Sequence, residues 1–213
     1  MMQKIKSSVR GVVEKIAVVL NRVTGGKLTP NHVTWLALFL HLPIAWLIAS
    51  NYLILAGFLV FIIGLFDTLD GSLARLQGRV SNVGGFLDAV TDRLKELLIY
   101  SGIGYLLVEQ HAPAWTIFIA LLACGLALTI PFIKSKGETF HAISGKKLEY
   151  SELNRVFGGG LLPYEVRIAL LAVALLAGLP WLYWILLGVA VLELMTVAQR
   201  LFAIMKFVEK HEN

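Results

Sequence analysis

The chain has 213 residues, of which 57% are hydrophobic and only 15% are charged, and its net charge is +5. Soluble domains carry about 25% charged residues, so a soluble fold of this length could not bury so much apolar surface and a bilayer must cover it. The single cysteine, Cys124, excludes an intramolecular disulfide. The excess of cations could indicate nucleic acid as a partner, but its distribution along the chain indicates a membrane surface instead.

Residues 3–23 carry an amphipathic helical pattern. Apolar residues recur every three or four positions and polar or charged residues occupy the other face. The apolar set is Ile5, Val9, Val12, Ile16 and Val19, and the charged set is Lys4, Lys6, Arg10, Glu14 and Lys15. This pattern predicts a helix in the plane of the membrane interface, with its cations over anionic headgroups. The alternative is an amphipathic helix packed on a soluble core.

Six apolar stretches follow, each close to the roughly 20 residues that a membrane-spanning helix needs. They lie near residues 32–50, 53–77, 84–108, 113–134, 163–179 and 181–206. The fold class predicted is therefore all-α integral membrane, with six transmembrane helices after an N-terminal interfacial helix. We divide the chain into a juxtamembrane segment, 1–30, and a transmembrane catalytic domain, 31–213. The first long apolar run begins near residue 33, too late for a cleavable signal peptide.

The cations predict the orientation of these spans. All 19 Lys and Arg residues fall in the N-terminal region, within 75–95 and 134–167, or from Arg200 onward. The turns near residues 51, 109–113 and 178–180 contain none. The positive-inside rule therefore places both termini and the loop near 135–160 in the cytoplasm, and predicts a multi-pass protein of the cytoplasmic membrane.

Four aspartates are concentrated around the turn between the second and third spans. Asp67 and Asp70 are three positions apart, and Asp88 and Asp92 are four apart, so each pair shares one helical face. Because the connection is short, the two helices should be antiparallel neighbours whose carboxylates meet at the cytoplasmic end. Such carboxylates repel one another unless cations neutralise them. Oxygen ligands suit Mg²⁺ or Mn²⁺, and two ions would fit four carboxylates and a diphosphate.

Small residues flank the aspartates. Gly71 and Ala74 share the face of the first pair, and Gly84 and Gly85 share the face of the second. They leave a trough in which a ligand can approach the backbone. Close helix–helix packing in a membrane is the alternative reason for small residues at these positions.

This segment resembles the signature of the CDP-alcohol phosphotransferases, D-x2-D-G-x2-A-R-x8-G-x3-D-x3-D. Residue types and spacing agree at every fixed position. The matching residues are Asp67, Asp70, Gly71, Ala74, Arg75, Gly84, Asp88 and Asp92. The six spans and the N-terminal helix are similar to the same family.

The resemblance implies a reaction and a role for each residue. Asp67, Asp70 and Asp88 would bind the metal ions, with Asp88 bridging, and Asp92 would be a further ligand or the general base for the acceptor hydroxyl. The nucleotide of a CDP-linked lipid, of CDP-diacylglycerol or CDP-archaeol type, would be held by Asp67, Asp70, Gly71, Ala74, Arg75 and Gly84. An alcohol would attack the lipid-bearing phosphorus and CMP would leave. The family also implies a homodimer among membrane lipids, and no nucleic acid.

The acceptor is predicted from cations near and beyond the signature. Two stretches, residues 78–81 (Gly-Arg-Val-Ser) and residues 86–93, which end at Arg93, look like the branch that accepts inositol phosphate. Members of this branch include phosphatidylinositol-phosphate and archaetidylinositol-phosphate synthases. The residues predicted to bind the acceptor phosphate are Arg93, Lys134, Lys136, Arg155 and Arg167. Glycerol 3-phosphate, as in phosphatidylglycerol-phosphate synthases, is the alternative acceptor. Membrane anchoring is the alternative role of Lys134 and Lys136.

Two rival classes fit the sequence less well. An intramembrane prenyltransferase would carry its aspartates on two distant helix pairs. A divalent-cation transporter would show polar groups near mid-bilayer on several spans and often repeated halves. Lys95 and Glu96 are expected around the metal ions. Glu193, inside the last span, needs a partner and is expected to find it at a helix interface.

Overall fold

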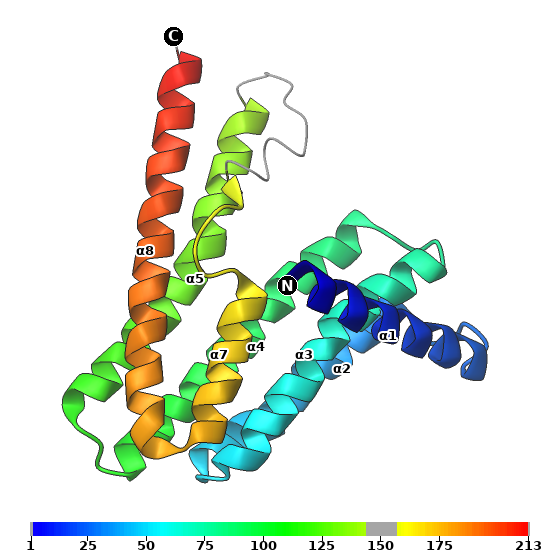
Figure 1. The fold of residues 1–213 in the computed structure, drawn as a ribbon. Helices are drawn as coiled ribbons and strands as arrows, with labels where there is room; N and C mark the ends of the chain where they lie inside the picture. Colours follow the sequence, from blue (N-terminus) through cyan, green and yellow to red (C-terminus); the bar gives the residue numbers. More distant parts are fainter. Residues whose placement is uncertain (1, 144–156, 213) are drawn as a thin grey trace. The chain divides into compact units, whose positions relative to one another are not determined.

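The computed structural model describes residues 2–143 and 157–212, and within these ranges all regular secondary structure is helical. The helices are α1 (Met2–Val23), α2 (Pro30–Ala49), α3 (Leu53–Leu76), α4 (Asn82–Glu109), α5 (Ala114–Ile143), α7 (Tyr164–Ala177) and α8 (Leu179–Glu212) (Figure 1). The predicted all-α class is confirmed. Each predicted span coincides with one helix from α2 onward.

The helix ends follow from local chemistry. Thr29 caps α2: its Oγ1 accepts a hydrogen bond from the His32 backbone N–H at 3.3 Å, while the Thr29 N–H donates to His32 Nδ1 at 3.3 Å. Pro30 occupies the first position, where the missing N–H costs nothing. At the other breaks the backbone turns left-handed, at Asn51 (φ 64°) after α2 and at Gly178 (φ 82°) between α7 and α8.

The chain forms two compact units, Met1–Gly102 and Ile103–Asn213. The first contains α1, α2, α3 and most of α4, and the second contains the end of α4 with α5, α7 and α8. The division predicted at residue 30 does not correspond to the boundary between these two units, because it separates an interfacial helix from the membrane-spanning region. That division stays a prediction.

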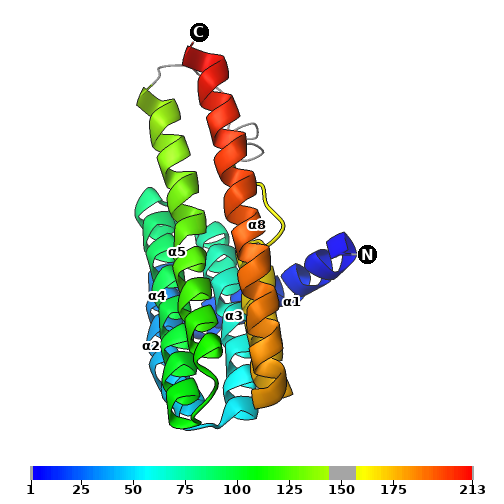
Figure 2. The ribbon, with the colours of Figure 1, turned by 90° about the vertical axis from the view of Figure 1, so that its left-hand side faces the viewer.

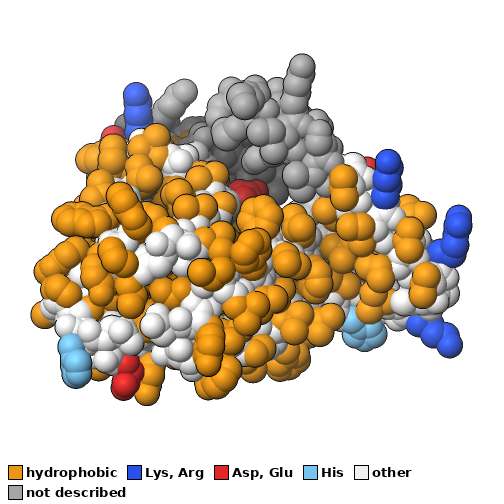
Figure 3. Space-filling view, turned by 60° about the horizontal axis from the view of Figure 1, so that its bottom comes forward, with side chains coloured by type: hydrophobic (Ala, Val, Ile, Leu, Met, Phe, Trp, Pro, Cys, Tyr) orange, Lys and Arg blue, Asp and Glu red, His pale blue; other side chains and the backbone are white. Residues whose placement is uncertain are grey.

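Four helices are long and apolar enough to cross a membrane: Pro30–Ala49, Leu53–Leu76, Ala114–Phe140 and Leu179–Glu209. Hydrophobic side chains also cover most of the face shown in Figure 3, so the chain is an integral membrane protein. By contrast, α7 has 14 residues, about 21 Å of helix against a hydrocarbon core of about 30 Å. Helix α4 is long enough, but it concentrates charge between Asp88 and Glu96. The number of six spans stays a prediction.

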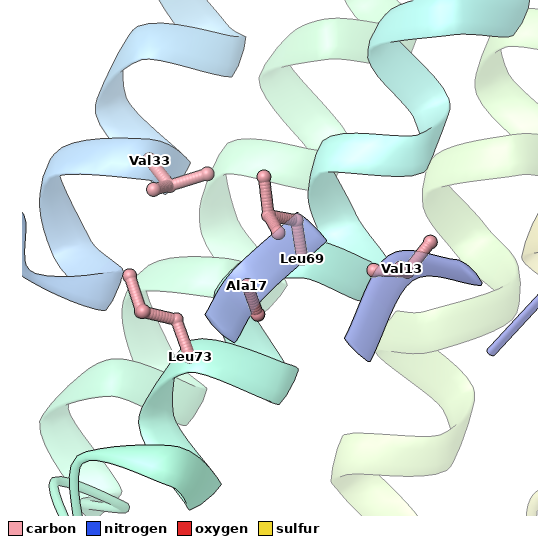
Figure 4. Close-up of a cluster of buried hydrophobic side chains, with 5 residues drawn as sticks. All are labelled: Val13, Ala17, Val33, Leu69 and Leu73. Carbon is pink, nitrogen blue, oxygen red and sulfur yellow. The ribbon is translucent and has the colours of Figure 1, made fainter. Parts of the chain in front are cut away.

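In the first unit, α1 packs across α3 (Figures 1 and 4). The contact is a cluster of buried hydrophobic side chains from three helices: Val13, Ala17, Val33, Leu69 and Leu73. Leu69 and Leu73 lie on the turns of α3 that carry Asp67 and Asp70, so this cluster fixes the part of the helix that bears the first two aspartates.

The face of α1 that packs on α3 is not the apolar face predicted from the sequence. Val12 and Val19 are exposed, at 58% and 60%, whereas Val13 and Ala17 are buried. Helix α1 therefore has one apolar edge on the protein and a second that is exposed. Its position in the membrane interface stays a prediction.

In the second unit, α5 and α8 run side by side, as Figures 1 and 2 show, and α7 packs on α8. Arg200 of α8 donates hydrogen bonds to the carbonyl oxygens of Ile130 at 2.9 Å and Gly159 at 2.8 Å. Glu193 of α8 pairs with Arg167 of α7, with 3.5 Å between Oε1 and Nε. The expected helix-interface partner of Glu193 is thus confirmed.

Candidate active site

The four aspartates lie on two helices of the first unit. Asp67 and Asp70 belong to the C-terminal part of α3, and Asp88 and Asp92 to the N-terminal half of α4. Asp88 lies within electrostatic reach of the other three aspartates and of Lys95. The two helices therefore bring the four carboxylates into one neighbourhood.

Lys95 bridges two of these aspartates. Its Nζ lies 2.5 Å from Asp67 Oδ1 and 3.0 Å from Asp92 Oδ1, and its side chain is only 1% exposed. Asp92 is on the same helix, one turn before Lys95, whereas Asp67 is on α3. The ammonium group thus ties the two helices together and neutralises part of their negative charge.

Asp70 is held by a residue of α2. The Thr34 hydroxyl donates to Asp70 Oδ2 at 2.6 Å, and the same Oγ1 lies 3.2 Å from the Pro30 carbonyl oxygen. A hydroxyl has one hydrogen, and the shorter contact to the carboxylate is the charge-assisted one. Thr34 is buried, so this hydrogen bond is shielded from water.

A cavity of about 190 Å³ opens beside Asp70 and Asp88. Four of its lining residues belong to the predicted nucleotide site without being acidic: Gly71, Ala74, Arg75 and Gly84. The others include Pro30, Asn31, Thr34, Arg79, Val80, Ser81 and Gly85. Asp67 and Asp92, which contact Lys95, are not among the lining residues. The cavity therefore meets one aspartate from α3 and one from α4.

The small residues give this cavity its wall. The Gly84 N–H donates to Ser81 Oγ at 3.1 Å at the start of α4. A Cβ on Gly84 would meet Ser81 Oγ at 3.3 Å and Asn31 Oδ1 at 3.6 Å, and one on Gly71 would meet Arg75 Nη1 at 3.6 Å. Larger side chains at these two glycines would therefore reach into the space that a ligand needs.

The donor set fits a hard divalent cation. Asp88 Oδ1 is buried and accepts no hydrogen bond from the residues that the structure describes, and a buried carboxylate oxygen without a donor is costly unless a cation satisfies it. The side-chain donors that line the cavity are oxygen atoms, including the carboxylates of Asp70 and Asp88, and oxygen ligands suit Mg²⁺ or Mn²⁺. Within the described ranges, no three acidic, His or Cys side chains already stand in metal-binding positions.

The residues predicted to bind the acceptor phosphate lie in different parts of the chain. Arg93, in the first unit, pairs with Glu96 at 2.6 Å. In the second unit, Lys134 Nζ lies 3.7 Å from Glu138 Oε1, the Lys136 ammonium lies 5.6 Å from the centre of the Phe132 ring, and Arg167 is buried against Glu193. Arg155 lies outside the described residues. Their joint action on one phosphate stays a prediction.

Two groups of contacts were not assigned from the sequence. Thr34 is 36 positions from Asp70, and no local pattern connects the two residues. Asn31 reaches the cavity from the first turn of α2, and Arg79 and Ser81 reach it from the loop before α4. In the sequence, Arg79 and Ser81 belong to a stretch that looks like the inositol-phosphate branch of the family. Ser81 directly precedes α4, where serine is a common N-terminal cap.

The apolar helices define a helical integral membrane protein, and the cavity lined by aspartates and arginines is its candidate site for a charged ligand. A family model of the CDP-alcohol phosphatidyltransferases matches residues 27–195, and the chain belongs to this family of transferases. The match includes every residue of the signature, from Asp67 to Asp92.

Relatives within the family agree with the branch suggested by the sequence. The chain is 31% identical to a phosphatidylinositol phosphate synthase of Corynebacterium glutamicum over 172 residues, which is 76% of this chain and 77% of that protein. It is 36% identical to an archaetidylinositol phosphate synthase of Pyrococcus horikoshii over 103 residues, which is 48% of this chain and 53% of that protein.

A solved structure has the same fold. The phosphatidylinositol phosphate synthase of Mycobacterium tuberculosis in complex with manganese and citrate superposes with a TM-score of 0.75 at 25% identity, over 91% of this chain and 88% of that one. The same mycobacterial protein with CDP-DAG bound gives a TM-score of 0.76 at 24% identity, over 91% and 93%.

Proposed function

We propose that this protein transfers a substituted phosphate group from a CDP-linked lipid to inositol phosphate and releases CMP, in a reaction that needs Mg²⁺ or Mn²⁺, with two ions per site. The observation that carries the proposal is the cavity beside Asp70 and Asp88, whose wall is made by Gly71, Ala74 and Gly84 of the family signature. The manganese in the mycobacterial relative supports the metal, and the CDP-DAG bound to that relative supports the lipid substrate.

The residues of the cavity suit a nucleotide diphosphate. Gly71, Ala74 and Gly84 let the ligand approach the backbone, and Arg75 places a cation at the same wall. The Arg75 Nη2 donates to Ser72 Oγ at 3.2 Å, which restricts the guanidinium while leaving further N–H groups for a phosphate. Asp70, fixed by Thr34, and Asp88, with its unsatisfied Oδ1, would hold the metal ion at the diphosphate.

Transfer of the phosphoryl group requires alignment and charge neutralisation more than covalent help. Bound divalent ions would supply that neutralisation and polarise the lipid-bearing phosphorus. The acceptor oxygen forms a bond to this phosphorus while the bond to the CMP oxygen breaks, and the proton of the hydroxyl passes to a carboxylate. Asp92 takes this proton as the general base or serves only as a metal ligand; both roles are compatible with its contact to Lys95.

The relatives support inositol phosphate as the acceptor, since the bacterial one is a phosphatidylinositol phosphate synthase and the archaeal one is an archaetidylinositol phosphate synthase. They differ in the lipid, which leaves CDP-diacylglycerol and CDP-archaeol as the two donor types. The predicted acceptor cations, Arg93, Lys134, Lys136, Arg155 and Arg167, suit an alcohol that carries its own phosphate.

The test is an assay of CMP release by the purified protein. CDP-diacylglycerol and CDP-archaeol are each offered with Mg²⁺ and one of four alcohols: inositol phosphate, glycerol 3-phosphate, serine or inositol. We expect CMP with inositol phosphate and none after chelation of the metal. If CMP is released only with glycerol 3-phosphate, then glycerol 3-phosphate and not inositol phosphate is the acceptor. If no combination of CDP-lipid and alcohol releases CMP, the proposed transferase activity is wrong.

The role of Asp88 is tested by Asp88→Asn, which keeps the shape of the side chain and removes its charge. We expect CMP release to fall by at least about a hundredfold, the effect typical of losing one strong electrostatic contact in an active site. Glu109→Gln, which removes an exposed carboxylate from the same helix, is the matched control and should retain activity. Normal turnover by Asp88→Asn would remove this residue from the metal site.

The charge distribution supports an active site and two termini that face the cytoplasm. The family resemblance supports a homodimer, which light scattering in detergent would distinguish from a monomer.

A further inference from the structure

Lys95 is the cation closest to the aspartates, and the family signature does not include it. Its Nζ contacts Asp67 Oδ1 and Asp92 Oδ1 at 2.5 Å and 3.0 Å. The side chain is 1% exposed, so water contributes little to the solvation of the ammonium group. A buried ammonium needs carboxylate partners, and here it has two, from two different helices.

These contacts divide the four aspartates into two pairs, each with one member from α3 and one from α4. Asp67 and Asp92 contact Lys95 and do not line the cavity. Asp70 and Asp88 do line it, and Asp88 Oδ1 is buried without a hydrogen-bond donor among the described residues. One pair therefore already has a cation of the chain between its carboxylates, which offsets part of their charge, while the other pair is open to a cation that enters through the cavity.

We propose that Lys95 is a positioning residue that acts as a built-in cation between Asp67 and Asp92. A divalent ion then binds first beside Asp70 and Asp88, and a second ion binds only by displacing the Lys95 ammonium from the other pair. This inference rests on the metal dependence in the proposed function. It adds the order in which the two ions bind, and it names Lys95 as the group that competes with the second ion.

Charge is the physical reason for the order. Without an ion, four carboxylates close together would repel one another, and the ammonium group reduces this repulsion and holds α3 to α4. When a second divalent ion approaches, the same ammonium opposes it by like-charge repulsion and by occupying the oxygen atoms that the ion needs. The Lys95 ammonium thus stabilises the folded protein without metal, and it lowers the affinity of the site for the second ion.

The experiment is a Mn²⁺ titration of the detergent-purified, chelator-stripped full chain without any lipid substrate, with free Mn²⁺ followed by electron paramagnetic resonance. Wild type is compared with Lys95→Met, which keeps the length of the side chain without its charge, and with Lys95→Gln, which keeps N–H donors without the charge. Lys27→Met removes an exposed lysine and is the matched control.

We expect wild type and Lys27→Met to bind one Mn²⁺ tightly and a second at least tenfold more weakly. Lys95→Met and Lys95→Gln should bind the second ion at least tenfold more tightly than wild type. If both Lys95 variants titrate like wild type, Lys95 does not compete with the metal and the inference is wrong. If wild type binds no Mn²⁺ at all, the metal dependence of the proposed function fails first, so the two failures are distinguishable.

Thermal unfolding gives a second measurement that does not depend on the titration. In chelator, Lys95→Met should unfold at a lower temperature than wild type, because the carboxylates lose their counter-ion. Mn²⁺ should raise its unfolding temperature by more than it raises that of wild type. A variant that folds only when Mn²⁺ is present throughout purification would support the inference, and an equal Mn²⁺ effect on both proteins would overturn it.

Discussion

At the scale of single residues, Thr34 and Lys95 determine how the aspartates are held. Thr34 donates to Asp70, and Lys95 donates to Asp67 and Asp92. Neither residue belongs to the signature, yet each fixes a carboxylate oxygen that a metal ion would otherwise share. The position of the signature residues therefore depends on hydrogen bonds from outside the signature.

Replacing Thr34 by Val, which has nearly the same shape, removes the hydrogen bond to Asp70. A hydrogen bond to a charged group contributes about 1.5–3 kcal/mol, so we expect the rate of CMP release at saturating substrate to fall by roughly tenfold to a hundredfold. The unfolding temperature should fall as well, because the buried Asp70 carboxylate loses its donor while the methyl groups of Val fill the same space. Steady-state kinetics of CMP release would measure the effect.

Thr34→Ser is the control for this prediction, because it restores the hydroxyl without the methyl group. It should recover most of the turnover and most of the Mn²⁺ affinity. If Thr34→Val and wild type have the same turnover, the hydrogen bond does not position Asp70 for the reaction.

The sequence predicts the grouping of the aspartates better than it predicts the residues that hold them by hydrogen bonds. The spacing of Asp67 and Asp70, and of Asp88 and Asp92, follows directly from helical periodicity, so the shared faces could be predicted. The contact between Thr34 and Asp70 depends on how α2 packs against α3, which no local pattern encodes. Lys95 lies one turn after Asp92 and was expected near the metal ions, but its contact with Asp67 depends on the packing of α4 on α3.

At the scale of the helices, α2 and α4 approach closely at Gly102. A Cβ at Gly102 would lie 2.7 Å from the Ala45 carbonyl oxygen and 3.1 Å from Ile48 Cβ. Backbone cannot move aside as a flexible side chain can. This glycine is therefore required by the contact between the two helices in the first unit.

Gly102→Ala should destabilise the protein by about 1–3 kcal/mol, the usual cost of overpacking. Gly104→Ala is a matched control two positions further along α4, where a Cβ meets nothing within 4 Å. It should be neutral or stabilise the helix by up to about 1 kcal/mol. Thermal unfolding in detergent measures both, and equal unfolding temperatures would show that the two helices can separate at this point without cost.

The contact between α7 and α8 contains the buried ion pair of Arg167 and Glu193. Removal of one partner leaves a buried charge, which costs about 3–5 kcal/mol, whereas removal of both is often close to neutral. Arg167→Met alone should therefore lower the unfolding temperature strongly, and the double variant Arg167→Met/Glu193→Leu should recover most of it.

The same double variant tests the predicted role of Arg167 at the acceptor. If Arg167 binds the acceptor phosphate, the stable double variant should have a raised KM for inositol phosphate and an unchanged KM for the CDP-lipid. A normal KM for both substrates would show that Arg167 does not bind the acceptor phosphate and serves only the contact between α7 and α8.

The helix boundaries show where sequence patterns stop being informative. The predicted span 53–77 agrees with α3, which ends at Leu76, because Gly78 has a positive φ of 63°. The span predicted at 113–134 is shorter than α5, which continues to Ile143. Polar residues after Lys134 ended the apolar run but not the helix, since hydrophobicity reports the lipid boundary and not the end of the hydrogen-bonded backbone.

At the scale of the whole molecule, the distribution of the cations along the chain predicts which side of the membrane each turn faces. If the positive-inside rule holds, Lys27 and His111 lie on opposite sides of the membrane. Both are exposed, and His111 lies in the cation-free turn between α4 and α5.

Single cysteines at these positions test the orientation in a Cys124→Ser background. In intact cells a membrane-impermeant maleimide should label His111→Cys, and it should label Lys27→Cys only after permeabilisation. The opposite pattern would place the aspartates on the outer side, where a CDP-linked substrate made in the cytoplasm could not reach them directly.

The division into two compact units has a consequence for how the protein is made. Thr34 and Lys95, which hold three of the four aspartates, belong with them to the unit that ends at Gly102. Translation proceeds from the N-terminus at about 5–20 residues per second, and domains generally fold as they emerge. The carboxylate site can therefore assemble before the second unit is complete, and the ammonium of Lys95 would offset the charge of this first unit before any metal ion arrives.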